Sequence, residues 1–569
     1  MNESAEPFSF GEDLKLGASL PRPVAVLATV AVVVEVVASL MLAATVKVPL
    51  WLDETLTVNI ASKPLTDLPS VLRHDGAPPL FYALLHVWMG IFGQSSFAVR
   101  MLPTCISAVT LLATFFIVKR IWTPSIAVMT IAILAGAPYF VYYSSECRMY
   151  ALVMLESVLL LGALEWAITA PTRKHLAAVA GCVAALLYTH YWSIYLLVLV
   201  FCWVAYFALF GQNRNSARRT LVAMVVGGIA FLPWVPVFLF QLGHTGTPWS
   251  GAQPISVVVE IFAWFSFNQA ALFQVPSLHS QLLIVGYLAI GAIGLLGIAT
   301  GRFTLTLDLR IQRRARLVAI WSVGTVIIGS FISMLSSSAV VTRYASVAFI
   351  PFVILMALGI ASFGEPWLRL LLVVGLGGVG LWSANQYHGT ARTESPRIAS
   401  ALEQFAQPGD VVAFCPDQLA PSTLRLSPLE QKLHVKAIGY PHFDRNPTII
   451  DWIDYEAAIR AADPLQFAKR LDVLAGPSHR IWLVSQPYAP GLHGKCIELR
   501  SALNTVRPGV GKLVVAVDLH RYWMPMQLTV FPGDGSDRIA PVRQRAGVRA
   551  DLHYRELVRD FGNGLRGSS

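Results

Sequence analysis

Long apolar runs separated by short polar stretches recur along the first two thirds of the chain. About 20 apolar residues cross a bilayer as a helix, so each run is a candidate membrane span. The pattern predicts about eleven spans, at residues 24–46, 97–118, 124–142, 149–169, 175–189, 191–210, 218–240, 281–300, 317–335, 345–363 and 368–384.

Composition supports a membrane protein. Of the 569 residues, 55% are hydrophobic and 13% are charged, whereas soluble domains carry about 25% charged residues. A soluble enzyme, a disordered protein and a disulfide-stapled secreted module are therefore excluded. Residues 384–569 hold more charges than all the residues before them. We therefore expect a cytoplasmic leader (1–23), a transmembrane unit (24–384) and a soluble domain (385–569).

The basic residues predict how the chain lies in the membrane. Loops on the side of the N-terminus collect fifteen Lys and Arg, and the opposite loops and span mouths hold six. Basic residues stay in cytoplasmic loops because they resist translocation. The N-terminus is therefore expected inside and, with an odd number of spans, the C-terminal domain outside. The same bias accounts for the net charge of +10, so we expect no nucleic-acid partner.

The soluble part alternates short β-rich runs with helical stretches, which predicts a small extracytoplasmic α/β domain. The expected strands are Val411–Cys415, Ile481–Ser485 and Lys512–Leu519, and the expected helices Ser395–Phe405, Glu456–Ala462 and Leu465–Leu474. The tail after Pro532 is expected to be flexible. Cys415 and Cys496 are the only cysteines here, and an oxidising exterior permits a disulfide between them, although their spacing does not decide it. A cap over the active site is the role we expect for this domain.

The first outer loop, residues 47–95, carries the clearest candidate chemistry. Asp53 and Glu54 follow the first span directly, and His74 and Asp75 precede a stiff Pro-Pro turn. Such carboxylates and a histidine at the mouth of a bundle suit a general base beside groups that position a phosphate or a metal. The half-apolar stretches Leu65–Leu72 and Leu80–Phe92 suit helices lying on the membrane surface.

Three further clusters are expected at the same outer face. Glu146, Arg148 and Tyr150 lie in the sequence YYSSECRMY. The Arg148 guanidinium suits a phosphate, although a structural Glu–Arg pair is the alternative. His190 and Trp192 lie between two spans, where an interfacial histidine is commonly structural.

Arg343 and Tyr344 form the third cluster. Arg343 has no acidic neighbour in the sequence, which favours a bound anion.

Glu35, Glu156 and Glu165 fall within spans and are candidate functional residues, because a charge inside a membrane is energetically expensive. The loop 241–280 is aromatic and almost uncharged, and it suits an interfacial helix or a lid over an apolar ligand.

The motifs together resemble those of the GT-C glycosyltransferases, and in particular glycosyltransferase family 39. That family includes the protein O-mannosyltransferases and the transferase that adds aminoarabinose to lipid A. The resemblance rests on Asp53-Glu54, the Pro-Pro-Leu-Phe-Tyr turn at 78–82, the Arg-x-Tyr at 148–150 and the Arg-Tyr at 343–344. It covers roughly residues 24–384 and is strongest across 48–150. The chain departs from the lipid A enzyme at Gly76 and Ala77, where that enzyme has a lysine before the turn.

The resemblance implies an inverting transfer of a sugar from a polyprenyl-phosphate carrier to an extracytoplasmic acceptor. Asp53 would be the general base, and Glu54 would orient it or share its task. The other implied roles are in binding the carrier phosphate (Arg148, Tyr150, Arg343 and His74) and in lining the sugar or lipid cavity (His190 and Trp192). Relatives differ in whether they bind a divalent metal, so the cofactor is left open.

We therefore expect a multi-pass cell-membrane enzyme that builds cell-envelope glycans or glycoproteins. Mannose is the favoured donor sugar, while the acceptor is a glycan, a lipid or a protein. The alternative is a transporter or flippase of lipid-linked sugars. The absence of an apparent internal repeat and the gathering of polar clusters at one face favour the enzyme over the transporter. A receptor would leave Asp53, Glu54 and Arg148 without a role.

Overall fold

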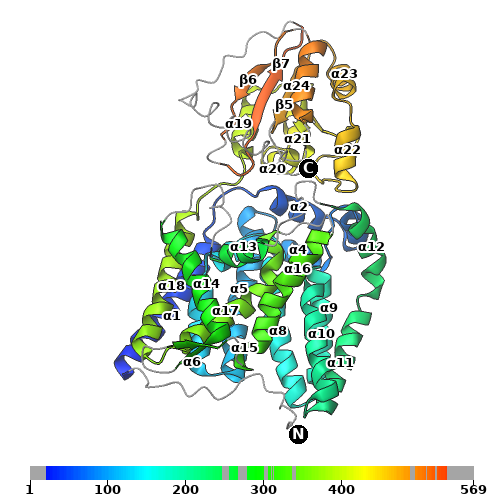
Figure 1. Ribbon diagram of the computed structural model, residues 1–569. Coiled ribbons are helices and arrows are strands. Elements are labelled where there is room, and N and C mark those ends of the chain that lie inside the picture. Colours follow the sequence, from blue (N-terminus) through cyan, green and yellow to red (C-terminus); the bar gives the residue numbers. More distant parts are fainter. Residues whose placement is uncertain are drawn as a thin grey trace, which may run out of the picture.

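A computed structural model describes residues 21–246, 256–266, 278–299, 305–308, 311, 313–335, 341–486, 492, 494–507, 509–518 and 522–534. Most of the predicted leader, much of the 241–280 loop and nearly all of the tail after Pro532 lie outside these residues. The described chain forms a helical bundle with a smaller domain above it (Figure 1).

Helices of the bundle follow the predicted apolar runs. They are α1 (Arg22–Ala44), α5 (Ser96–Ile121), α6 (Pro124–Gly136), α7 (Pro138–Tyr143), α8 (Tyr150–Thr169), α9 (Arg173–Thr189), α10 (Ser193–Phe210), α11 (Arg214–Ile229), α12 (Val235–His244), α14 (Leu278–Leu296), α15 (Arg313–Ala319), α16 (Thr325–Leu335), α17 (Ser346–Ala361) and α18 (Pro366–Gln386). Two short strands, β1 (Gly297–Ala299) and β2 (Leu305–Leu307), pair after α14.

Each of the eleven predicted segments contains helix, and within the described residues eight helical stretches are long and apolar enough to cross a membrane. The other three predicted segments, 124–142, 175–189 and 281–300, correspond to shorter or interrupted helices. The segment predicted over 124–142 is helical but consists of two helices, α6 and α7, because the chain leaves the helix at Ala137. Pro138 has no backbone N–H to donate and disfavours helical geometry in the residue before it.

Glycines allow α6 and α18 to approach very closely. A Cβ on Gly380 would lie 2.1 Å from the Gly136 carbonyl oxygen, and a Cβ on Gly136 would lie 2.3 Å from the Gly377 Cα atom. The carboxylate of Glu35 on α1 occupies the space that a Cβ on Gly377 would need. The three helices therefore meet at a contact that larger residues would not permit.

Shorter helices lie at the top of the bundle, where it meets the second domain (Figure 1). They are α2 (Leu52–Ala61), α3 (Leu68–Leu72), α4 (Leu80–Phe92) and α13 (Val257–Trp264), with single 3-10 turns at Leu65–Asp67, Leu232–Trp234 and Thr342–Ala345. The predicted stretches at 65–72 and 80–92 are thus helical. The turn at Leu232–Trp234 contains a proline and separates α11 from α12 within the span expected over 218–240.

Five strands form the sheet of the upper domain, in the order β4-β3-β5-β7-β6. The strands β4, β3 and β5 are parallel, and β7 and β6 complete the sheet antiparallel. Their bounds are β3 (Val411–Cys415), β4 (Lys436–Gly439), β5 (Ile481–Ser485), β6 (Lys512–Val515) and β7 (Gln527–Phe531). The helices are α19 (Ser395–Phe405), α20 (Ala420–Leu426), α21 (Leu429–Leu433), α22 (Tyr455–Ala461), α23 (Pro464–Ala475) and α24 (Lys495–Val506).

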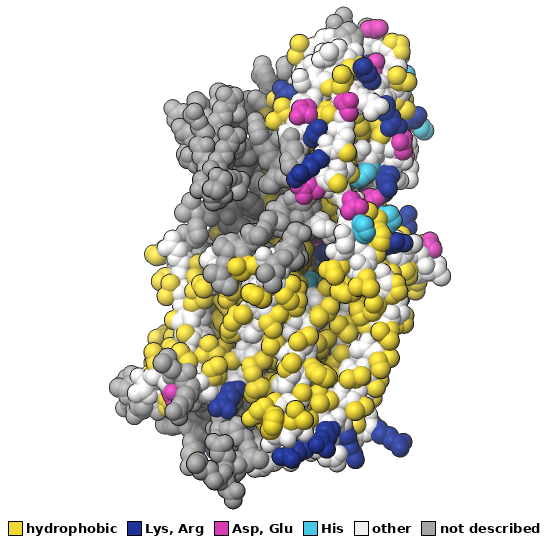
Figure 2. All heavy atoms as spheres, turned by 45° about the vertical axis from the view of Figure 1, so that its right-hand side comes forward, with side chains coloured by type: hydrophobic (Ala, Val, Ile, Leu, Met, Phe, Trp, Pro, Cys, Tyr) yellow, Lys and Arg dark blue, Asp and Glu magenta, His cyan; other side chains and the backbone are white. Residues whose placement is uncertain are grey.

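The α/β character of this domain is as predicted, but the sequence missed β4 and β7. The third expected strand also ends earlier, at Val515. Cys415 at the end of β3 and Cys496 in α24 form a disulfide, with their Cα atoms 5.5 Å apart. Figure 2 shows a broad apolar surface on the visible face of the bundle, with Lys and Arg side chains gathered at its lower rim, far from the upper domain.

Candidate active site

The helix α2 presents Asp53 and Glu54 in its first turn, at the junction of the bundle and the upper domain. Carboxylates are favourable there because the first turn of a helix has unpaired N–H groups and the positive end of the helix dipole. Asp53 and Glu54 contact different partners, so one carboxylate is buried and the other is partly exposed.

Glu54 forms a buried ion pair with Arg100 of α5. Arg100 donates through Nε to Oε1 (2.8 Å) and through NH2 to Oε2 (2.6 Å), while the Cys147 amide donates to Oε1 (3.1 Å). Arg100 also donates to the carbonyl groups of Val48 and Pro49. Burial alone would raise the pKa of Glu54, but Arg100, Arg392 and the Cys147 amide together lower it. Glu54 is thus a charged support for the corner between α1 and α2.

Asp53 is more open than Glu54. Its Oδ2 lies 3.5 Å from NH2 of Arg343, and its side chain is 17% exposed. Arg343 comes from the 3-10 turn before α17, almost three hundred residues along the chain. The buried Nε of Arg343 makes no hydrogen bond among the described residues. The Asp53 carboxylate can therefore still accept hydrogen bonds, and the neighbouring Arg343 can still donate one through Nε.

Arg148 is held one turn further along the face of α2 that carries Asp53. It donates through NH1 to Oγ1 of Thr57 (2.9 Å) and to the hydroxyl of Tyr82 (3.4 Å). The Tyr82 hydroxyl donates to Oδ2 of Asp75 (2.6 Å). Burial raises the pKa of Asp75, although Arg148 and the Tyr82 hydrogen bond oppose the rise. Within the described chain, Nε of Arg148 is buried without a hydrogen-bond partner.

His190 lies close to both arginines and is uncharged. Burial, together with Arg148 and Arg343, lowers the pKa of His190 to about 3. The ring lies 5.3 Å from that of Tyr344 and 6.1 Å from that of Tyr150, measured between centroids. The Trp192 amide donates to Nδ1 of His190 (3.2 Å). Uncharged aromatic rings therefore lie next to Arg148 and Arg343.

His74, by contrast, faces the upper domain. Its Nδ1 lies 2.8 Å from Oδ1 of Asp451, and its carbonyl oxygen accepts a hydrogen bond from the Trp452 amide. A second pair, His244 with Asp454 at 3.1 Å, crosses the same junction. The structure thus brings His74 to the interface between the domains.

Two arginines of this region were missed by the sequence analysis. Glu146 pairs with Arg392, which follows α18, rather than with Arg148: NH1 of Arg392 donates to Oε1 of Glu146 (3.0 Å). Nε1 of Trp51 donates to the same oxygen (3.1 Å). Arg100 and Arg392 lie in segments without other motifs, so only a basic residue close to the end of a span could have indicated them.

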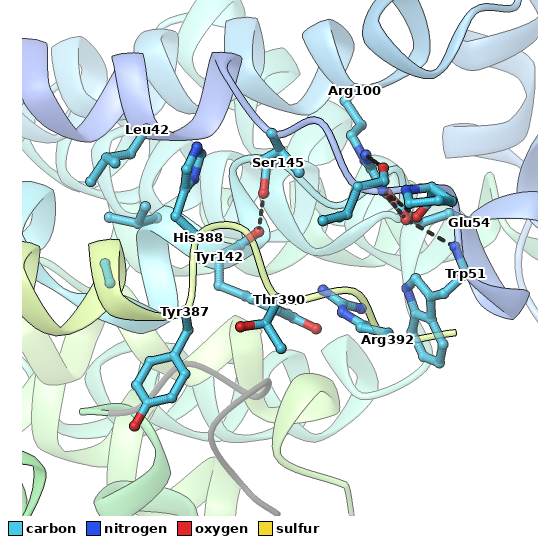
Figure 3. A pocket seen from close by; sticks show the side chains of 15 residues that line it. Leu42, Trp51, Glu54, Arg100, Tyr142, Ser145, Tyr387, His388, Thr390 and Arg392 are labelled. Atoms are coloured by element: carbon cyan, nitrogen blue, oxygen red, sulfur yellow. Dashed lines mark hydrogen bonds and ion pairs between the residues drawn. The ribbon is translucent and has the colours of Figure 1, made fainter. Parts of the chain in front are cut away.

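A pocket adjoins this cluster, between the ends of α1 and α18 and the first turn of α2 (Figure 3). Leu42, Ser145 and Arg392 line it from three segments that are far apart in the sequence. Among the residues that the structure describes, no group of three or more His, Cys, Asp or Glu is placed to hold a metal ion.

Two of the three acidic residues within the bundle accept a hydrogen bond from a threonine. Thr189 donates to Glu156 (2.8 Å), and Thr169 donates to Glu165 (3.2 Å). One carboxylate oxygen of Glu35, Oε2, is buried without a partner in the described structure.

Comparison with known proteins places this geometry in context. A family model described as dolichyl-phosphate-mannose-protein mannosyltransferase matches residues 76–240. No match was found among curated proteins. The crystal structure of ArnT from Cupriavidus metallidurans in the apo state aligns with a TM-score of 0.56 and 13% identity, over 89% of this chain and 98% of that chain. The same protein bound to undecaprenyl phosphate aligns with a TM-score of 0.52 and 14% identity, over 90% and 98%.

These alignments extend over the bundle and most of the upper domain, so the similarity concerns the whole architecture. At such low identity they establish the fold and leave the substrates open. The predicted resemblance is confirmed at this level: the chain has the fold of the GT-C membrane glycosyltransferases, with membrane-spanning helices and a small C-terminal sheet domain.

Proposed function

We propose that the protein transfers a sugar, with inversion, from a polyprenyl-phosphate carrier to an acceptor hydroxyl at the extracytoplasmic membrane surface. The observation that carries the proposal is the pairing of the partly exposed Asp53 carboxylate with Arg343, beside Arg148. The matched ArnT structure is of a complex with undecaprenyl phosphate, which supports a carrier of this class.

The chemistry follows from the charges. Asp53 takes the proton of the acceptor hydroxyl while that oxygen attacks the anomeric carbon, and the bond from this carbon to the phosphate oxygen breaks. The phosphate leaves with the bonding electrons, so its negative charge grows in the transition state. Fixed cations aimed at it lower the barrier. Arg148 and Arg343 serve this purpose, and each has an Nε without a hydrogen-bond partner in the described structure.

The remaining predicted residues take supporting roles in this proposal. Tyr150 and Tyr344 lie beside the two cations, and His190 and Trp192 add uncharged rings next to these tyrosines. Glu54 supports α2 instead of sharing the work of the base, because its oxygens already accept hydrogen bonds from Arg100. His74 is left out of the phosphate site because its ring bonds to Asp451.

Residues 24–384 form the catalytic membrane unit in this proposal, and residues 385–569 form an extracytoplasmic domain above it. The positively charged lower rim of the bundle supports this orientation. Mannose is the favoured sugar because the matched family model is that of mannosyltransferases. Arabinose and aminoarabinose are the other candidates, and the product belongs to the cell envelope.

The test is sugar transfer by the purified full-length protein, supplied with radiolabelled polyprenyl-phosphate mannose and crude membrane acceptors. Wild type should label an acceptor, and Asp53→Asn should lose transfer by at least a hundredfold because no base remains. Asp67→Asn is the matched control, since Asp67 is an exposed carboxylate in the same outer loop. It should transfer as well as wild type.

Transfer by Asp53→Asn at the wild-type rate would show that Asp53 is not the base. A parallel assay with polyprenyl-phosphate arabinose separates the donor sugars. If neither donor is consumed although the carrier lipid binds, the flippase alternative replaces the transferase.

A further inference from the structure

The helix that carries Asp53 is shared between two hydrophobic cores. The start of α2 is buried with the core of the upper domain, and its end is buried in the core of the bundle. The residues are Trp51, Leu52 and Leu56 at the start and Val58, Ile60 and Ala61 at the end. The position of the base therefore depends on how the two domains hold this one helix.

Arg392 is placed to control the start of α2. It lies in the short connection between α18 and α19, where the chain passes from the bundle to the upper domain. Its guanidinium carbon lies 4.8 Å from the centroid of the Trp51 ring and 4.1 Å from that of Tyr142. Figure 3 shows Arg392 between Tyr142 and Trp51.

The Trp51 side chain is held by three groups, Glu146, Arg392 and Trp523. Its Nε1 donates to Glu146, the carboxylate that also accepts from Arg392, and Trp523 stacks on its ring with centroids 5.0 Å apart. Trp523 belongs to the upper domain, whereas Glu146 belongs to the loop before α8. Because Trp51 is the residue directly before α2, fixing its ring fixes the first turn of that helix.

We propose that Arg392 is a positioning residue for the transfer reaction: by holding Glu146 and the Trp51 ring, it fixes the first turn of α2 and hence the carboxylate of Asp53. The inference rests on the function proposed above and adds that the interdomain connection is part of the catalytic apparatus. Arg392 does not touch the reacting atoms in this scheme.

The size of the expected effect follows from geometry. Displacement of a catalytic group by about 1 Å can cost about a hundredfold in rate. Without Arg392, the buried Glu146 carboxylate loses its ion-pair partner, and the remaining contacts of Trp51 must rearrange around it. Carrier binding does not depend on Arg392, because the phosphate is assigned to Arg148 and Arg343.

The experiment compares Arg392→Gln and Arg392→Lys with wild type, using the full-length protein and the donor that wild type consumes. Arg392→Gln should lower kcat by about 10- to 100-fold and leave the KM for the donor unchanged. Arg392→Lys should recover part of the loss, because an ammonium can pair with Glu146 but cannot stack as a plane on the aromatic rings.

Arg470→Gln is the matched control. Arg470 also pairs with a carboxylate, Asp444, and lies 3.8 Å from the ring centroid of Phe443, but on the surface of the upper domain. Its removal should leave both kinetic constants unchanged. Should Arg392→Gln fail to fold, Trp51→Phe replaces it: this variant keeps a ring and removes the donor to Glu146, and it should lower kcat in the same manner.

Three results would overturn the inference. Unchanged kinetics in Arg392→Gln, or in its substitute Trp51→Phe, would show that the connection does not position the base. A raised donor KM with unchanged kcat would assign Arg392 to substrate binding instead. A wild-type protein that consumes no sugar donor would remove both this inference and the proposed function, so the two failures are distinguishable.

Discussion

At the scale of single residues, neighbouring carboxylates have different surroundings because their partners differ. Glu54 is enclosed by Arg100 and a backbone amide, whereas Asp53 lies 3.5 Å from NH2 of Arg343 and retains contact with solvent. The sequence Asp-Glu predicted a carboxylate site, but it could not say which of the two would be open. That difference comes from the direction in which each side chain leaves the first turn of α2.

The Glu54–Arg100 pair leads to a stability prediction. Glu54→Gln should destabilise the protein by about 3–5 kcal/mol, because it leaves a buried guanidinium without its counter-charge. The pKa of Glu54 is lowered in the folded state, so the stabilisation is present above its ordinary value near 4.5 and is lost as the pH falls through the folded-state pKa. The difference between variant and wild type should therefore shrink in acid.

Thermal unfolding in detergent, repeated across pH, measures this difference. Glu403→Gln is the control, because Glu403 forms an exposed pair with Lys432 and should contribute less than about 1 kcal/mol. A Glu54→Gln variant as stable as this control would contradict the structural role of the buried pair.

At the scale of elements, apolar length predicts where helices lie but does not determine how closely they pack. The helices α6 and α18 approach one another through Gly136 and Gly380, and neither glycine was identified from the sequence. The breaks at Ala137 and at the turn Leu232–Trp234 follow from prolines that the apolar runs concealed. In the upper domain, β4 is short and partly exposed, so its pattern was too weak to identify.

The close approach of α6 and α18 predicts a clear contrast between two glycines of one helix. Gly380→Ala should destabilise the protein by about 1–3 kcal/mol, because the new Cβ would collide with the Gly136 carbonyl group. Gly378→Ala should have no such cost, since a Cβ there meets nothing within 4 Å. Equal melting temperatures for the two variants in detergent would show that the helices do not meet at this contact.

At the scale of the whole molecule, charge is arranged along one axis. Basic side chains collect at the lower rim of the apolar surface, and the upper domain carries both signs of charge (Figure 2). The candidate site lies at the opposite end of the bundle from the basic rim, directly below the upper domain (Figure 1). An outward-facing site is the arrangement that the positive-inside rule favours.

Cysteine labelling of intact cells tests this orientation. In a background without the four free cysteines, a membrane-impermeant maleimide should label Ser501→Cys in α24 and should not label Asn213→Cys near the basic rim. Both positions are exposed, and permeabilised cells, in which both should react, provide the control. Labelling of Asn213→Cys alone in intact cells would reverse the proposed topology.

The sequence by itself determined that this is a membrane protein, where its helices lie, and that an α/β domain follows them. These features depend on local patterns, since apolar runs, charge bias and strand-like segments are each visible within a few tens of residues. The partners of the buried charges depend instead on the tertiary structure: Asp53 with Arg343, Glu54 with Arg100 and Glu146 with Arg392. Each pair joins segments that only the packing of the helices brings together. A charged residue could not be matched with its partner beforehand, because nothing in the local sequence indicates which distant segment will pack against it.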